Sequence, residues 1–222
     1  MKLVILGATG GIGRQLVDRA LAAGHDVTAV VRDPARLTAR PVRVVTADLA
    51  AADPAALRDA VGGADAVLSG LGPRSAADVG VATRGTRAAL SAMAAAGVRR
   101  IIVVSAAPVG TVPSPGRPNP PRHDPGEGFV MRHVLTPAIK RVLRGNYADL
   151  AEMEEVLRDS AADWTVVRPP RLTDGPATDG YRVAYGRNLR RGFTVSRADV
   201  AGLMLRLLDR PDSIGQVVGV AN

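Results

Sequence analysis

Cysteine is absent from the 222 residues of this chain, which excludes disulfide bonds, thiolate-ligated metals and a cysteine nucleophile. Aromatic residues make up only 3% of the chain, so the core must consist of Val, Leu, Ile and Ala. No apolar run approaches the roughly 20 residues that span a bilayer. An apolar strand begins already at Lys2, which leaves no room for a signal peptide. We therefore expect a soluble, cytoplasmic protein with no membrane partner.

Lysine is nearly absent as well. Only Lys2 and Lys140 occur, and scattered arginines supply most of the positive charge behind the net +8. There is no basic arm or tail, and few aromatic side chains could stack on bases. We therefore expect no nucleic-acid partner. The charge instead suits an acidic small molecule such as a dinucleotide, and we expect a monomer or a homodimer that acts on an anionic or aromatic small-molecule substrate.

Short β-rich runs alternate with helical patterns over the first two thirds of the chain, which predicts a parallel sheet covered on both faces. The runs are almost continuously apolar, as in strands that are buried on both sides. They predict strands at 2–6, 26–31, 42–46, 65–69, 98–104, 163–168 and 216–220. The predicted fold class is α/β: a single Rossmann-type domain over 1–222, doubly wound, with a mostly parallel sheet of about seven strands.

The helices between these strands have recognisable ends. Gly24 and Gly97 directly follow helical patterns at 11–23 and 84–96. Helices often end with a glycine in the left-handed conformation at this position. Further helices are predicted after Asp53, over 146–160, and from Ser196, an N-cap, to about residue 208. A hairpin is predicted over 181–195.

Residues 107–128 interrupt the alternation, because seven prolines follow one another among glycines and polar residues. We expect no regular element there, since each proline lacks an N–H donor and has a fixed φ. A helical pattern resumes at about 129 and is interrupted at Pro137. A loop of this length in a compact domain is commonly functional. We therefore interpret 107–145 as a proline-rich loop and helical insertion over the substrate site.

Three glycine positions, Gly7, Gly10 or Gly11, and Gly13, lie between the first predicted strand and the first predicted helix. Glycines in this context allow a tight turn, backbone approach to a pyrophosphate, and close packing of helix on strand. The helix N-terminus would then present free N–H groups to the phosphates. The alternative is an ordinary tight turn.

Arg32 ends the second predicted strand. An NAD-preferring site usually has a carboxylate at that position, whereas an arginine meets a 2′-phosphate. Arg36 lies one turn further on and could join it. This predicts NADP(H) as the cofactor in preference to NADH. Alternatively, Asp33 caps the next helix and Arg32 is solvated.

At this point the residues resemble a known family. The segments that carry the likeness are Gly-Ala-Thr-Gly-Gly-Ile-Gly at 7–13, Val-Arg-Asp-Pro at 31–34, Ala-Asp-Leu at 47–49, Val-Val-Ser-Ala at 103–106, Trp-Thr-Val-Val-Arg-Pro-Pro at 164–170 and Ser-Arg-Ala-Asp-Val-Ala at 196–201. They resemble the atypical short-chain dehydrogenases/reductases, in particular the biliverdin-IXβ reductase/flavin reductase-like or NmrA-like subgroup. The likeness weakens over the proline-rich loop and the helical stretch after it.

The resemblance implies a place for each candidate cofactor-binding residue. Thr9, Gly10 and Ile12 would line the pyrophosphate, Arg32 and Arg36 the 2′-phosphate, Asp48 and Leu49 the adenine, Leu71, Gly72 and Arg74 the ribose and phosphates, Ser105 and Ala106 the nicotinamide, and Pro169, Pro170, Arg171 and Leu172 its other side. All of these follow predicted strands, where ligands of parallel sheets bind.

The chain also departs from the family pattern. The wider superfamily has a catalytic tyrosine with a lysine four residues later, but Ala151 follows Tyr147 at that spacing. The flavin reductase-like group has a serine at the position of Ala106, with Ser105 just before it here. The catalytic candidates are therefore Ser105 and Tyr147.

Other polar residues have more than one interpretation. His123 and His133 could face a substrate, but no carboxylate spacing suggests a metal site or a catalytic triad, so no metal is expected. The acidic residues Glu152, Glu154, Glu155 and Asp159 are best explained as a solvated helix face near Arg158. Trp164 would belong to the core or to a wall of the cofactor pocket. Arg132, Lys140, Arg141 and Arg144 would form a basic rim or be merely exposed.

Three functions remain open. The first is an NADPH-dependent oxidoreductase that reduces a flavin, a quinone or a related conjugated acceptor. The second is a reductase, dehydratase or epimerase of a specialised pathway, with Tyr147, His133 or a loop residue as its acid–base group. The third is a non-catalytic NADP-binding sensor.

Overall fold

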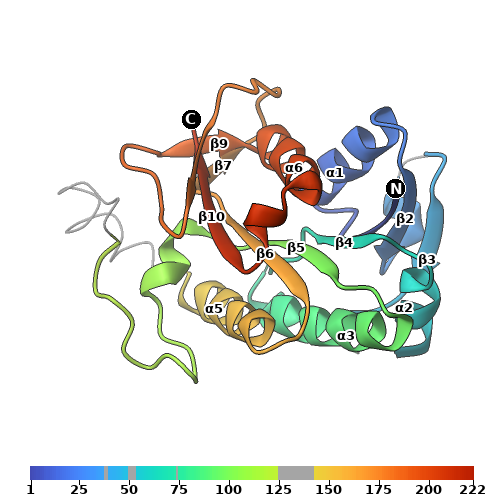
Figure 1. Cartoon of the computed structure of the whole chain (residues 1–222), viewed down its shortest axis with the longest axis horizontal. Coiled ribbons are helices and arrows are strands. Elements are labelled where there is room, and N and C mark those ends of the chain that lie inside the picture. The colour runs from blue at the N-terminus through green and yellow to red at the C-terminus, as the bar shows by residue number, and fades with distance from the viewer. Residues whose placement is uncertain (38–39, 50–53, 74, 125–142) are drawn as a thin grey trace.

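One central sheet of eight strands dominates the computed structural model, which describes residues 1–37, 40–49, 54–73, 75–124 and 143–222 (Figure 1). The strands lie in the order β3 (Arg43–Thr46), β2 (Asp26–Val31), β1 (Lys2–Leu6), β4 (Ala66–Ser69), β5 (Arg100–Val104), β6 (Asp163–Arg168), β10 (Gln216–Ala221) and β8 (Arg182–Tyr185). Every neighbouring pair is parallel except β10 and β8. The seven parallel strands are the seven that the sequence predicts, which confirms the doubly wound α/β fold.

Helices cover both faces of the sheet (Figure 1). Helices α1 (Gly11–Ala22) and α6 (Arg197–Arg206) pack side by side on one face. Helices α2 (Pro54–Val61), α3 (Val81–Ala96) and α5 (Arg144–Arg158) cover the other face. All five begin within three residues of the starts expected from the sequence.

Two apolar clusters, one on each face, form the core. Leu3 and Ile5 of β1 belong to the cluster that includes helices α1 and α6. Val4 and Leu6 belong to the cluster beneath α2, α3 and α5. Because successive strand residues point to opposite faces, one continuously apolar strand supplies both clusters.

The predicted hairpin over 181–195 is wrong. Strand β8 pairs with β10 in antiparallel orientation, and β9 (Thr194–Ser196) pairs in parallel with β7 (Arg171–Thr173) as a separate two-stranded sheet. The two strands lie close in sequence, but the open edge of β10 and the backbone of β7 offer each of them a different partner.

The described part of the proline-rich segment, 107–124, contains a short regular element, contrary to expectation. Residues Ala107–Thr111 form a 3-10 helix with Pro108 in its first turn. Proline is tolerated there because its missing N–H would have no helical partner. The helix predicted from about 129 lies outside the described residues.

Helix α3 begins three residues earlier than predicted, and its N-terminus is capped from another helix. The carboxylate of Asp149 on α5 accepts hydrogen bonds from the N–H groups of Ala82 at 3.1 Å and Thr83 at 2.9 Å. The N-cap residue, Gly80, has a φ of 91° and no side chain to serve this purpose. The buried Asp149 therefore joins α5 to α3.

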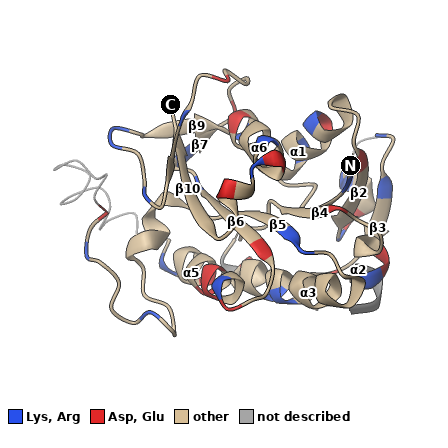
Figure 2. Cartoon of the chain, viewed as in Figure 1, with Lys and Arg blue, Asp and Glu red and all other residues tan. Residues whose placement is uncertain are grey.

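Charged side chains are distributed over most elements, with basic and acidic residues interspersed (Figure 2). In the described part of the chain, no helix combines the length and apolar character needed to cross a membrane. The same residues include no group of three His, Cys, Asp or Glu side chains placed to hold a metal ion.

Candidate cofactor site

The glycine turn between β1 and α1 is tightly constrained by its own backbone. The N–H of Gly10 donates to the carbonyl of Gly7 at 2.8 Å. Gly7 has a φ of +71°, and a Cβ at Gly13 would lie 2.1 Å from the Gly7 oxygen. Gly7 and Gly13 must therefore be glycines so that the turn closes and the helix packs on it.

Helix α1 begins at this turn without any carboxylate. Its N-cap residue, Gly10, makes no side-chain capping hydrogen bond, and its first turn has no acidic residue. The first four N–H groups of a helix lack partners within the helix and make its N-terminus partly positive. This end of α1 therefore suits an anion.

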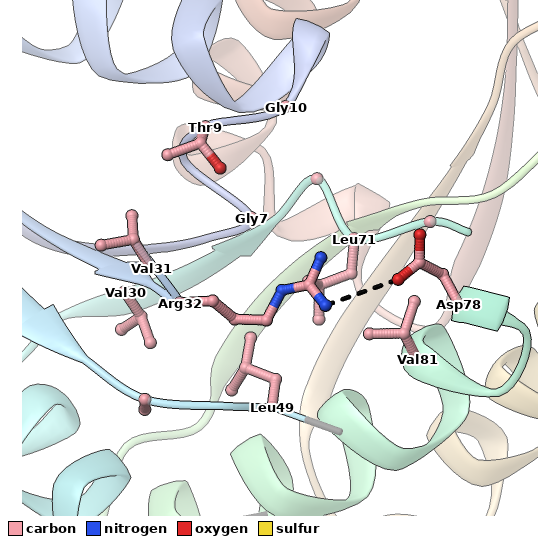
Figure 3. A pocket seen from close by; sticks show the side chains of 13 residues that line it. Gly7, Thr9, Gly10, Val30, Val31, Arg32, Leu49, Leu71, Asp78 and Val81 are labelled. Carbon is pink, nitrogen blue, oxygen red and sulfur yellow. Dashed lines mark hydrogen bonds and ion pairs between the residues drawn. The ribbon is translucent and has the colours of Figure 1, made fainter. Parts of the chain in front are cut away.

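A pocket opens beside the turn, at the carboxyl ends of β1, β2 and β4 (Figure 3). It lies where the strand order reverses at β1, which is where ligands bind in open parallel sheets. The lining residues are Gly7, Thr9, Gly10, Val30, Val31, Arg32, Ala47, Leu49, Gly70, Leu71, Gly72, Asp78 and Val81.

Arg32 is the cationic residue among the described residues that line this pocket, and it faces Asp78 (Figure 3). One guanidinium nitrogen of Arg32 lies 3.4 Å from the Asp78 carboxylate. The Arg32 side chain is 53% exposed, so its ion pair with Asp78 is weak. Arg32 can therefore exchange Asp78 for an anionic group of a ligand. The Ser75 hydroxyl donates to the other oxygen of Asp78 at 3.2 Å.

The remaining residues near β2 have other roles. Asp33 accepts a hydrogen bond from the N–H of Ala35 at 3.0 Å and caps the 3-10 helix Pro34–Arg36. Asp33 therefore caps this helix, as the alternative interpretation predicts. Arg32 nevertheless lines the pocket. Arg36 is exposed and does not line the pocket, and Arg74 lies outside the described residues.

The pocket brings together some of the predicted cofactor residues. Those that line it are Gly7, Thr9, Gly10, Arg32, Leu49, Leu71 and Gly72. Those described but placed elsewhere are Gly11, Ile12, Gly13, Arg36, Asp48, Ser105, Ala106, Pro169, Pro170, Arg171 and Leu172. Ile12 is buried in the core between α1 and the sheet, so its side chain does not face the pocket.

Sequence reasoning missed several lining residues. Val30, Val31 and Gly70 could have been found, because they end predicted strands or follow them directly. Asp78 belongs to a short 3-10 helix, Ala76–Asp78, for which the sequence contains no signal that we recognise.

A second polar site lies at the carboxyl ends of β5 and β6, around Glu154. The Ser105 hydroxyl donates to one oxygen of this carboxylate at 2.7 Å. Arg168, at the end of β6, donates to both oxygens, and Arg158 donates to the second. The Glu154 side chain is 1% exposed and that of Arg168 is 9% exposed.

This network corrects the prediction that Glu154 belongs to a solvated acidic face. Helix α5 turns Glu154 toward β6, where Arg168 neutralises it. Glu152 does lie at the surface and pairs with Arg87 at 3.1 Å, and Asp159 is exposed. The Glu155 carboxylate accepts a hydrogen bond from the Gly116 N–H at 2.6 Å, which ties the proline-rich segment to α5.

Tyr147 lies in the first turn of α5 and is half-buried against the core. Burial raises the pKa of its phenol. The residue four positions later, Ala151, is buried and cannot supply the ammonium group that would lower that pKa. Among the described residues, none gives Tyr147 the activation that the superfamily's lysine gives its catalytic tyrosine.

The fold and the pocket define a dinucleotide-binding protein of the Rossmann class. Residues 7–211 match the family model described as NAD(P)H-binding, and the chain belongs to that family. The predicted NAD(P)-binding Rossmann family and the nicotinamide type of cofactor are thereby confirmed.

Similar proteins include several reductases. Over 168 residues, or 75% of this chain, it is 32% identical to the (4-alkanoyl-5-oxo-2,5-dihydrofuran-3-yl)methyl phosphate reductase of Streptomyces griseus. The match covers 46% of that relative, so the chain spans about half of its length.

Many solved structures share the fold, and two examples match over the whole chain. The anaerobilin reductase ChuY of Escherichia coli O157:H7 is 25% identical, with a TM-score of 0.76 and 97% of its own chain covered. A wide-type short-chain dehydrogenase/reductase of Veillonella parvula DSM 2008, solved in complex with NADP, is 20% identical, with a TM-score of 0.75 and 94% of its chain covered.

Proposed function

We propose that the chain is an NADPH-dependent oxidoreductase that reduces a flavin, a quinone or a related conjugated acceptor. In this proposal the adenosine lies between the apolar walls formed by Leu49, Leu71 and Val81, and Arg32 meets the 2′-phosphate. The pyrophosphate lies at the N-terminus of α1. The bound cofactor would supply the hydride, and the chain would bind and orient both reactants.

The residues fit such a cofactor. A Cβ at Gly7 would lie 3.2 Å from the backbone of Gly70, so the turn and the end of β4 approach closely and leave little room for a side chain. The backbone of Gly10 is exposed toward the pocket, and the α1 N-terminus has no acidic residue in its first turn. An anion is therefore not repelled by any carboxylate of that turn.

The observation that carries the choice of acceptor is the hydrogen bond from Ser105 to Glu154. The hydroxyl proton of Ser105 is held by a buried carboxylate, so only the oxygen lone pairs remain for a ligand. The carboxylate oxygens of Glu154 also accept hydrogen bonds from Arg158 and Arg168. Ser105 is therefore suited to orient the nicotinamide rather than to protonate a substrate.

A conjugated acceptor suits a site in which Ser105 does not protonate the substrate. Hydride transfer into a conjugated system spreads the negative charge, so the proton can come from water. The name of the Streptomyces griseus relative describes a carbon–carbon double bond, one carbon of which carries both a lactone carbonyl and an acyl carbonyl, on a molecule with a phosphate. That substrate is conjugated, as is the acceptor class proposed here.

The test is NADPH oxidation by the purified protein with a panel of flavins, quinones, acylated unsaturated lactones, simple ketones and aldehydes. We expect turnover with conjugated acceptors only, and Tyr147→Phe should keep most of the rate. Ser105→Ala should lower the rate with every accepted substrate alike. Turnover confined to ketones and lost in Tyr147→Phe would favour a carbonyl reductase or epimerase. Tight NADPH binding with no turnover would favour a sensor.

A further inference from the structure

Arg197 lies across the first residue of α1. It is the first residue of α6, and its side chain passes over Gly11. A Cβ at Gly11 would lie 2.6 Å from both Cδ and Nε of Arg197. The second glycine of the Gly10-Gly11 pair thus makes room for an arginine from a distant part of the chain.

This position is electrostatically unfavourable for a cation. The N-terminus of a helix is partly positive, and a positive side chain beside it is disfavoured. The N-termini of two other helices have acidic partners: α3 has Asp149 and α6 has Asp199. Helix α1 has no acid in its first turn and has Arg197 beside it. An anion bound at this place would turn the repulsion into attraction from both sides.

The ion pair that Arg197 does make is easily exchanged. One guanidinium nitrogen lies 2.7 Å from the carboxylate of Asp174, whose side chain is 88% exposed. Exposed pairs of this kind contribute little to stability. The Arg197 side chain itself is 29% exposed, so it remains accessible to a ligand.

Arg197 and Arg32 approach the glycine turn from different elements. Arg32 lines the pocket beside Thr9 and Gly10, whereas neither Gly11 nor Arg197 lines it. Helix α6 packs along α1 on the opposite face of the sheet from α3, whose first residue, Val81, lines the pocket. The turn is thus flanked by two cations, which a ligand with phosphates at two points would bridge.

We propose that Arg197 is a second cationic ligand of the cofactor and binds its pyrophosphate, while Arg32 binds the 2′-phosphate. This inference rests on the proposed NADPH-binding function. A guanidinium can donate two parallel hydrogen bonds to phosphate oxygens, which distinguishes it from a lysine at the same place.

The experiment separates the two phosphate sites by calorimetric titration of four ligands: NADPH, NADH, ADP-ribose and adenosine 2′-monophosphate. Arg197→Gln should weaken the three pyrophosphate ligands roughly 10-fold or more and leave adenosine 2′-monophosphate within about twofold. Arg32→Gln should weaken NADPH and adenosine 2′-monophosphate and spare NADH. Arg197→Lys should recover part of the loss.

Arg206→Gln is the matched control, because Arg206 lies on the same helix and pairs with the exposed Asp179 at 3.2 Å. It removes the same charge and should leave all four affinities unchanged. A folded Arg197→Gln protein with parental affinity for NADH and ADP-ribose would overturn the role of Arg197 and leave the proposed function standing. An equal loss for all four ligands would also overturn it, since that indicates a general distortion. A parent protein that binds neither dinucleotide would overturn both proposals.

Discussion

The hydroxyl of Ser105 donates a hydrogen bond to the carboxylate of Glu154 across 2.7 Å, from the end of β5 to the middle of α5. Arg168 donates to the same carboxylate from β6, so three elements meet at one buried side chain. This arrangement fixes the rotamer of Ser105 and connects the predicted nicotinamide end of the site to the stability of the domain.

Glu154→Gln should destabilise the fold by about 3–5 kcal/mol, because it leaves the guanidinium of Arg168 buried without a counter-charge. Chemical denaturation monitored by circular dichroism measures this loss. Glu152→Gln on the same helix is the control and should change the free energy of unfolding by less than about 1 kcal/mol, since Glu152 forms an exposed pair. Equal effects of the two variants would contradict a structural role for the buried carboxylate.

Arg32→Ala should remove the preference for NADPH. One charged hydrogen-bonded contact of about 1.5–3 kcal/mol corresponds to a ratio of roughly 10- to 150-fold between NADPH and NADH. The variant should bind the two cofactors almost equally, with NADH affinity unchanged. Arg36→Ala should have a smaller effect, because Arg36 does not line the pocket. Equal affinity for both cofactors in the parent protein, measured by calorimetry, would refute the assignment of Arg32.

Two glycine substitutions should separate binding from folding. Gly10 has φ −78° and ψ 170°, which any residue adopts, so Gly10→Val should fold and yet lose dinucleotide affinity. Gly13→Ala should instead destabilise the protein by about 1–3 kcal/mol, because its Cβ would overlap the Gly7 carbonyl. Thermal unfolding and NADPH titration of both variants check this. A folded Gly10→Val protein that binds NADPH at parental affinity would show that Gly10 is only structural.

Because of Asp199, the free energy of unfolding should decrease as the pH falls into the acid range. Burial raises the pKa of its carboxyl, but four hydrogen bonds from Thr178, Asp179 and Ser196 outweigh that effect and hold the pKa below its usual value. A carboxyl with a lowered pKa in the folded state stabilises the protein above the unfolded pKa of about 3.9, and this contribution is lost as the pH falls further. The difference in unfolding free energy between the parent and Asp199→Asn should therefore be largest near neutral pH and shrink below about pH 4. A difference that does not change between pH 7 and pH 3 would contradict this account.

The sequence predicts the seven parallel strands because each is an almost continuous apolar run. It also predicts Gly7, Gly10 and Arg32 at the pocket, since strand ends and turns are local features. The surroundings of Glu154 are a different case. Its acidic neighbours suggest a solvated face, and nothing in the sequence shows that Arg168, on another element, lies opposite it.

The sequence also does not predict which strands pair with each other. Strands β8 and β9 are close in sequence and apolar enough to suggest a hairpin, but their partners are β10 and β7. The sequence pattern predicts that a strand forms, but it does not predict which distant strand pairs with it. Arg197 was missed for the same reason: its segment contributes to the family resemblance, while its contact with Gly11 joins residues far apart in the chain.

The hydrogen bonds of the Asp149 carboxylate affect which parts of this fold can vary between relatives. The carboxylate fixes the start of α3, whose first residue, Val81, lines the cofactor pocket, to the second turn of α5. Helix α5, which begins at Arg144, is thus anchored to the cofactor-binding half at the end of the insertion predicted over 107–145. Insertions of different length and composition could be exchanged between relatives with little disturbance to the pocket, because the chain returns to the same fixed point. If the predicted insertion covers the acceptor, as in the proposed function, acceptor specificity can in this way evolve independently of cofactor binding.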